Sequence, residues 1–149
     1  ETRLSDVIEG PHGPARQFWT SGYLPGPRYL HRPVFVLVSG TTFSGGEALA
    51  YDLQALGRAT IVGEVTRGGA HPSSVLSLGD NVELRLPVAR TVNPVTGTDW
   101  EAVGVQPDTA VPAEKALETA HAAILDQLLN SADTPAPVRE EARLARAGL

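Results

Sequence analysis

The chain has 149 residues, of which 42% are hydrophobic, and this suits a single domain with its own core. Its 12 Lys and Arg residues stand against 17 Asp and Glu residues, and the net charge of −5 gives no basic footprint for nucleic acid. The absence of cysteine excludes disulfides, a thiol nucleophile and a Cys-ligated metal. No run of about 18 apolar residues occurs, so no membrane span is expected. The chain opens at Glu1 and contains no Met, and we expect it to be a piece of a longer protein.

The first 32 residues are rich in residues that break helices and strands. Gly-Pro pairs at 10–11 and 13–14, and a Pro-Gly-Pro run at 25–27, favour turns and loops. Aromatic residues lie among these breakers. We therefore predict that 1–32 is an irregular, aromatic-containing segment that packs on the domain. The aromatic residues are Phe18, Trp19, Tyr23 and Tyr29.

The next part of the chain has the pattern of a strand, a helix and a second strand. Residues 33–38 (PVFVLV) form a continuous apolar run, which is typical of a strand buried on both faces of a parallel sheet. A helix is predicted from Ser44 to Leu56, because a glycine follows as a stop signal. The run ATIVG at 59–63 predicts a second buried strand. Together they predict a right-handed βαβ unit.

The remaining residues predict a hairpin, a short strand and two helices. Apolar stretches at 75–78 and 82–88 flank Gly-Asp-Asn, which is typical of a hairpin turn. A short strand is expected within 103–111. The helix predicted at 113–129 is amphipathic. Its predicted buried side consists of Ala116, Leu117, Ala120, Ile124 and Leu128.

Proline residues separate this amphipathic helix from a short, charged helix predicted at 138–147. We expect that second helix to be peripheral. The body of the domain is therefore placed at 33–131, and a linker with a peripheral helix is placed at 132–149.

Ser44 is the first candidate for chemistry. It follows an apolar strand and a turn, and it precedes two glycines, which places it at a helix N-terminus. The unpaired N–H groups of a first helical turn can stabilise a developing oxyanion. However, Ser44 to Glu47 also reads S-x-x-E, the pattern of a capping box in which the hydroxyl only caps the helix. The local pattern alone favours the cap, although the hydroxyls of the preceding turn offer other caps that could leave Ser44 free.

The ordered motifs between Arg32 and Asp108 resemble the tail-specific, or C-terminal processing, serine peptidase family. The run R-P-V-F-V-L-V-S-G-T-T-F-S-G-G-E-A-L-A resembles the nucleophile segment of that family. The runs T-R-G-G-A-H-P and N-P-V-T-G-T-D-W-E-A-V-G-V-Q-P-D are similar to the branch with tricorn core protease and interphotoreceptor retinoid-binding protein. The resemblance covers most of residues 17–125. It implies an α/β fold similar to the Clp protease/crotonase spiral, with a mixed sheet and flanking helices, here as part of a domain.

The same resemblance implies hydrolysis of peptide bonds through an acyl-enzyme. It assigns the nucleophile to Ser44 and the oxyanion amide to Gly45. The processing peptidases use a Lys as general base in the Gly-rich loop after the second strand, and the matching position here is Gly69. Arg67 cannot replace that Lys, because a guanidinium group stays protonated near neutral pH. The only lysine, Lys115, lies in the late helix, so a Ser–Lys dyad is not supported.

The tricorn-like branch instead uses Ser, His, a second Ser and Glu. The resemblance places its Glu at Glu101 and its His and second Ser upstream of Glu1, so the fragment alone is predicted to be inactive. On the residues alone, Glu101 is a solvated turn carboxylate. His71 suits base work near neutral pH, but we interpret it, with Gly68 and Gly69, as substrate-pocket wall. No two His residues have zinc-ligand spacing, so we expect no metal and no cofactor.

Two other classes of protein share this framework. The retinoid-binding relatives carry apolar ligands, so a non-catalytic module that binds retinoid-like or fatty-acid-like molecules is the alternative. A crotonase-type acyl-CoA enzyme would share the spiral but would not need a Ser after the strand. The expected partner is a peptide or unfolded protein, and a homo-oligomer is left open. The residues do not fix the compartment, and the resemblance favours an extracytoplasmic one.

Overall fold

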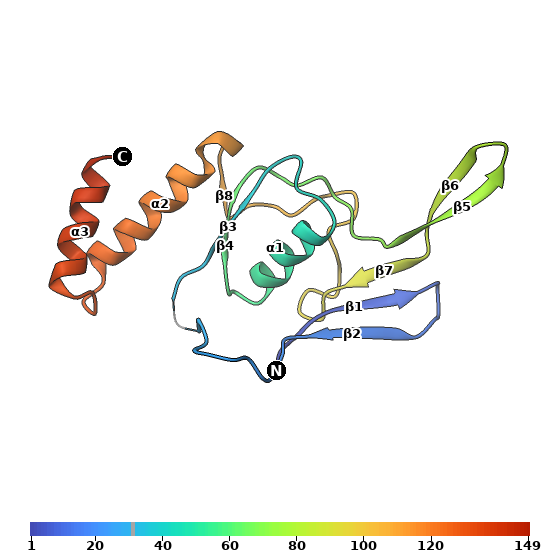
Figure 1. The fold of residues 1–149 in the computed structure, drawn as a ribbon, viewed down its shortest axis with the longest axis horizontal. Helices are drawn as coiled ribbons and strands as arrows, with labels where there is room; N and C mark the ends of the chain where they lie inside the picture. The colour runs from blue at the N-terminus through green and yellow to red at the C-terminus, as the bar shows by residue number, and fades with distance from the viewer. Residues whose placement is uncertain (31) are drawn as a thin grey trace.

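The computed structural model describes residues 1–30 and 32–149; residue 31, within the segment predicted to be irregular, lies outside the described residues. In the described residues all the strands precede residue 111, with one helix among them, and two helices form the C-terminal end (Figure 1). The elements are β1 (Arg3–Glu9), β2 (Ala15–Trp19), β3 (Phe35–Val38), α1 (Gly45–Ala55), β4 (Thr60–Gly63), β5 (Ser73–Gly79), β6 (Val82–Pro87), β7 (Ala89–Val92), β8 (Thr109–Ala110), α2 (Ala113–Asn130) and α3 (Ala136–Ala147).

The predicted βαβ unit is confirmed and forms the centre of the fold. Strands β3, β4 and β8 pair in parallel, with Val38 opposite Gly63 and Val62 opposite Thr109. Successive residues of β4 point to opposite faces of this sheet. Ile61 belongs to the core cluster that includes residues of α1, whereas Val62 packs with residues of α2. Helices therefore cover both faces, and the expected α/β class with flanking helices is confirmed.

The parallel and antiparallel strands lie in separate small sheets. Strands β2, β1 and β7 form a three-stranded antiparallel sheet, and β5 and β6 form a two-stranded one. The predicted hairpin turn is confirmed, with Asp80 and Asn81 at φ values of 48° and 62°, as a tight hairpin turn requires. Both faces of the β5–β6 ribbon are exposed, because it extends away from the body of the fold (Figure 1).

The prediction of irregular structure was wrong for the first 19 residues. Strands β1 and β2 form an antiparallel hairpin, and β1 also pairs with β7. The Gly-Pro pairs that suggested a loop lie at or next to the connection between the two strands. The aromatic side chains at 18, 19, 23 and 29 are exposed rather than packed on the domain.

The two C-terminal helices are confirmed, but the buried side of α2 was only partly predicted. Ala116 and Ala120 are buried against the sheet, whereas Leu117 is 69% exposed and Leu125 is buried in its place. The difference arises because α2 contacts both the sheet and α3. Within the described residues, no helix has both the length and the apolar character that a bilayer crossing requires.

A buried carboxylate on α1 fixes the geometry around the start of that helix. The Glu47 side chain is 0% exposed. Its Oε1 accepts hydrogen bonds from the Thr66 hydroxyl at 2.5 Å and the Gly68 N–H at 2.6 Å. Its Oε2 accepts from the Gly69 N–H at 2.9 Å and the Ser44 N–H at 2.7 Å. Glu47 therefore ties the turn that precedes α1 to the Gly-rich loop that follows β4.

Replacing Glu47 by Gln is expected to destabilise the fold. The amide group of Gln would direct N–H donors at backbone N–H groups, and a buried donor left without a partner costs about 1–3 kcal/mol. We expect the free energy of unfolding to fall by about 2 kcal/mol or more, measured by urea unfolding followed through tryptophan fluorescence. Glu141→Gln on the exposed face of α3 is the matched control. An unchanged unfolding free energy for Glu47→Gln would contradict the assigned role.

The stabilisation from Glu47 is expected to disappear in acid. Burial acts to raise the pKa of this carboxylate, but its hydrogen bonds outweigh burial and hold the pKa below the ordinary value of 4.5. Such a group stabilises the fold fully above the unfolded pKa and loses its contribution as pH falls through the folded pKa. The stability difference between the wild-type protein and Glu47→Gln should shrink between about pH 5 and pH 3. A difference that grows on acidification would contradict this sign.

Candidate active site

Ser44 begins α1 in a backbone conformation that residues other than glycine rarely adopt. Its φ and ψ are 52° and −116°, and strain of this kind costs about 1–3 kcal/mol and is often found at functional sites. The bond from the Ser44 N–H to the Glu47 carboxylate holds the turn in place. In the preceding turn, the hydroxyls of Ser39 and Thr41 bond each other at 2.9 Å. The Thr42 hydroxyl accepts from the Ser39 N–H.

Ser44 and Glu47 form a capping box at the start of α1. The Ser44 hydroxyl faces the Glu47 N–H without making a full side-chain cap hydrogen bond, and the Glu47 carboxylate accepts a hydrogen bond from the Ser44 N–H. The residue is exposed. Next to it, the N–H of Gly45 has no hydrogen-bond partner among the residues that the structure describes. An exposed hydroxyl, held only by the capping box, and an unpaired N–H thus lie side by side at the positive end of a helix.

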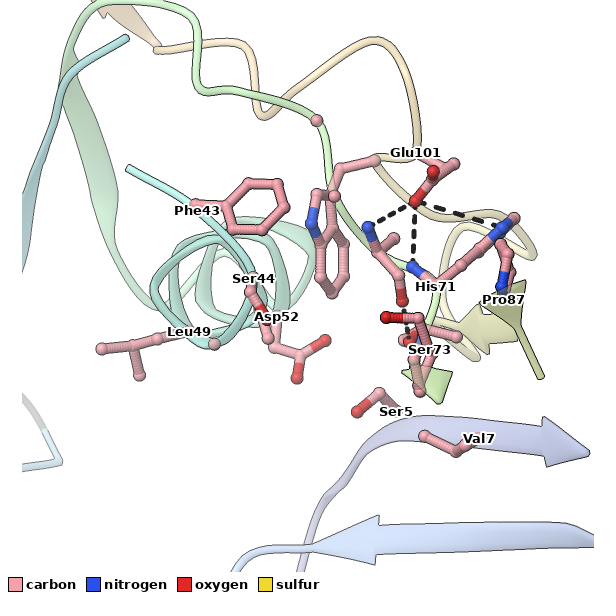
Figure 2. A pocket seen from close by; sticks show the side chains of 18 of the residues that line it. Ser5, Val7, Phe43, Ser44, Leu49, Asp52, His71, Ser73, Pro87 and Glu101 are labelled. Atoms are coloured by element: carbon pink, nitrogen blue, oxygen red, sulfur yellow. Dashed lines mark hydrogen bonds and ion pairs between the residues drawn. The ribbon is translucent and has the colours of Figure 1, made fainter. Parts of the chain in front are cut away.

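A cavity of about 1010 Å³ opens beside Ser44 (Figure 2). It lies between α1, strand β1, the loop that follows β4, and the bases of the β5–β6 ribbon and β7. All six residues that the sequence singled out line this cavity. They are Ser44, Gly45, Gly68, Gly69, His71 and Glu101. Much of the remaining wall is apolar and includes Leu4, Val7, Phe18, Phe43, Leu49 and Trp100.

Glu101 is bonded to the Gly-rich loop rather than to Ser44. Its Oε2 accepts hydrogen bonds from the N–H groups of Ala70 at 2.6 Å and His71 at 2.9 Å. The ring of His71 is held by carboxylates on both sides: Nε2 lies 3.2 Å from Asp99 Oδ2, and Nδ1 lies 4.0 Å from Glu101 Oε2. Figure 2 shows Glu101 and His71 across the cavity from Ser44. In this arrangement His71 serves as cavity wall.

The Gly-rich loop passes so close to its neighbours that side chains are excluded. Gly68 has φ of +87°, and a Cβ there would lie 3.0 Å from the Gly104 backbone nitrogen. A Cβ at Gly69 would overlap the ring of Phe43. Arg67 turns back over that ring, with its guanidinium carbon 5.0 Å from the ring centre. The Phe43 ring therefore leaves no room for a side chain at Gly69, the position that the sequence resemblance matches to a Lys.

Two carboxylates of α1 were missed as parts of the site. The sequence showed Glu47 only as a capping residue. Asp52 also lines the cavity and is only 7% exposed. Burial raises the pKa of Asp52 from its ordinary value of 3.8, although hydrogen bonds from Asn93 and Ser5 oppose the rise. The spacing of Asp52, eight residues after Ser44 on the same helix, was a signal that could have found it.

Comparison with known proteins identifies the family of the chain. The model of peptidase family S41 matches residues 10–111, more than half of the chain. A carboxy-terminal-processing protease of Bartonella bacilliformis is 36% identical over 80 residues, which cover 54% of this chain and 18% of that protein. The carboxyl-terminal-processing peptidase 2, chloroplastic, of Arabidopsis thaliana is 41% identical over 80 residues, covering 54% of this chain and 15% of that protein. The matched region thus covers less than a fifth of the length of these two relatives.

Solved structures share the fold. The photosystem II D1 C-terminal processing protease is similar with a TM-score of 0.60 and 27% identity, over 89% of this chain and 33% of that one. A lipoprotein from Streptococcus agalactiae has a TM-score of 0.62 at 14% identity, over 85% of this chain and 45% of that one, a likeness of fold alone. The α/β arrangement predicted from the sequence is therefore that of part of an S41 protease domain. On the match to residues 10–111, the chain belongs to peptidase family S41.

Proposed function

We propose that this chain carries the nucleophile of a serine peptidase and that Ser44 forms the acyl-enzyme. The observation that carries the proposal is the exposed Ser44 hydroxyl, which lines a large cavity next to the unpaired N–H of Gly45. Membership of family S41 supports the reaction class. The substrate class we infer is a short or unfolded peptide, because the cavity is open and bordered by exposed strands.

The proposed reaction follows the chemistry of an activated hydroxyl. Ser44 Oγ attacks the carbonyl carbon of the peptide bond, and its proton passes to a general base. The C–N bond then breaks, the amine leaves with a proton, and water hydrolyses the resulting ester. The Gly45 N–H is placed to donate to the oxyanion, a contribution of about 3–4 kcal/mol per donor in known sites.

We place the general base outside the described residues. Both ring nitrogens of His71 face carboxylates, and its ring lies across the cavity from Ser44 (Figure 2). Lys115 lies in the first turn of α2 and does not line the cavity. Gly69, at the position of the processing-peptidase Lys, is closed by the Phe43 ring. These placements support a base that comes from another part of the whole protein, as the tricorn-like resemblance implies.

The second candidate function is a carrier of apolar ligands, and the largely apolar wall of the cavity favours it. The two candidates differ in what they require of Ser44. A peptidase needs its hydroxyl to be nucleophilic, whereas a carrier needs only the apolar wall. Labelling of the whole protein with a fluorophosphonate, located by peptide mass spectrometry, separates them. Modification at Ser44 supports the peptidase, and tight retinoid or fatty-acid binding without modification supports the carrier.

Replacing Ser44 by Ala in the whole protein is expected to abolish peptide hydrolysis. Removal of a serine nucleophile lowers kcat by roughly 10⁴-fold or more, and the assay is cleavage of casein and of quenched fluorescent peptides. Ser77→Ala on the exposed ribbon is the matched control and should leave turnover unchanged. Turnover that survives in Ser44→Ala would refute the assignment of the nucleophile.

Replacing Gly69 by Lys is expected to destabilise the protein instead of creating a Ser–Lys dyad. The new side chain would collide with the Phe43 ring, and overpacking of this kind costs about 1–3 kcal/mol. The melting temperature should fall, and Phe43→Ala in the same protein should recover part of the loss. Gly148→Lys is the control, because the nearest atom to a Cβ there is 3.6 Å away. A stable Gly69→Lys variant with higher peptidase activity would overturn this account of the loop.

A further inference from the structure

Asp52 is a buried carboxylate that opens onto the same cavity as Ser44. It is 7% exposed and lines the cavity from α1 (Figure 2). Asn93 Nδ2 donates to its Oδ1 at 2.9 Å, and the same Nδ2 group donates to the Leu4 carbonyl. Asn93 is itself 0% exposed. The carboxylate is therefore held in one orientation, and Figure 2 shows it pointing from α1 toward Ser5 and the space between them.

This carboxylate has no cationic partner. No Lys, Arg or His nitrogen in the described part of the chain lies within 4.0 Å of Asp52. Arg3, which precedes Leu4 in β1, is paired with Asp6. The other charged groups that line the cavity are Arg85 and Glu101, with His71 beside them. Asp52 has hydrogen bonds from Asn93 and Ser5 but no counter-ion. A buried carboxylate without a counter-ion opposes folding, and its place in a ligand-sized cavity points to a ligand that supplies the cation.

The distance between Asp52 and Ser44 determines which substrate side chains can contact Asp52 while the reacting carbonyl lies at Ser44. Asp52 follows Ser44 by eight residues, which corresponds to about 12 Å along a helix. A substrate whose carbonyl lies at Ser44 therefore meets Asp52 only through a long side chain. Lys and Arg combine that length with a cation, and their apolar stems suit walls such as Leu49 and Trp100.

We propose that Asp52 is a specificity-determining residue, which selects substrates with a Lys or Arg side chain next to the bond that Ser44 attacks. The position of that bond rests on the proposed peptidase function, whereas recognition of the basic side chain by Asp52 does not. Arg85 and His71 lie with the loop and ribbon side of the cavity, so the acidic subsite is confined to the α1–β1 side.

Peptide binding tests the inference independently of hydrolysis. The protein is the whole protein with Ser44→Ala. The ligands are fluorescein-labelled, N-acetylated alanine hexapeptides with one central residue of Lys, norleucine or 2,3-diaminopropionic acid. Fluorescence anisotropy is expected to show the Lys peptide binding about tenfold more tightly or better than the norleucine peptide, as for a desolvated charge pair. The short diaminopropionic side chain should give no such gain. Asp52→Asn should bring the Lys and norleucine affinities to within about twofold of each other.

Controls separate recognition from a structural role. Asp133→Asn, at an exposed position outside the cavity, should keep the Lys preference. Because the pKa of Asp52 is raised, its ionised form destabilises the fold, so Asp52→Asn should keep or raise the melting temperature at neutral pH. A lower melting temperature together with an unchanged Lys preference would make Asp52 a structural residue and overturn the inference.

The remaining outcomes are also decisive. Equal affinity for Lys and norleucine peptides, or no binding of either, overturns the inference. A free-amine norleucine peptide that binds as tightly as the acetylated Lys peptide also overturns it, because the cation would then be the α-amine. Lys-selective binding without hydrolysis by the wild-type protein refutes the peptidase proposal but supports Asp52. Hydrolysis without a Lys preference supports the peptidase proposal but refutes the role of Asp52.

Discussion

The carboxylate of Glu47 is the group on which the rest of the site depends, because it joins two segments that are about 20 residues apart. It accepts hydrogen bonds from the N–H of Ser44 on one side and from the Gly-rich loop on the other. These bonds hold Ser44 at a positive φ that would otherwise be unfavourable. They also bring the loop so close to the turn that Gly69 meets the Phe43 ring. The position of Ser44 and the strain in its backbone thus both depend on the hydrogen bonds of Glu47.

The site that results brings Ser44, Gly45, His71 and Glu101 to the wall of one cavity. The exposed hydroxyl of Ser44 and the unpaired N–H of Gly45 lie at the positive end of α1. Glu101 and His71 occupy the opposite wall and hold each other through the loop. Because the Phe43 ring lies against Gly69, a side chain there would collide with it. The matched region covers less than a fifth of the length of the named S41 relatives.

Two carboxylates of α1 show how hydrogen bonding decides the role of a buried charge. Donors outweigh the effect of burial at Glu47 and lower its pKa, so its charge stabilises the fold. Burial dominates at Asp52 and raises its pKa, so its charge weakens the fold. Groups whose environments push their pKa values apart commonly have different functions. This contrast supports a positioning role for Glu47 and the proposed ligand-binding role for Asp52.

The sequence by itself determined the parts of the fold that depend on neighbours along the chain. The apolar runs at 33–38 and 59–63, the turn before β6 and the start of α1 at Ser44 were predictable, because periodicity and turn residues report local burial and backbone geometry. Only the tertiary structure decided the β1–β2 hairpin, whose strand β1 pairs with the distant β7. It likewise decided that Leu117 is exposed and that Asp52 lies in the cavity. Contacts between distant segments leave no periodic signal in one sequence, so the cavity and its charges appear only when those segments meet.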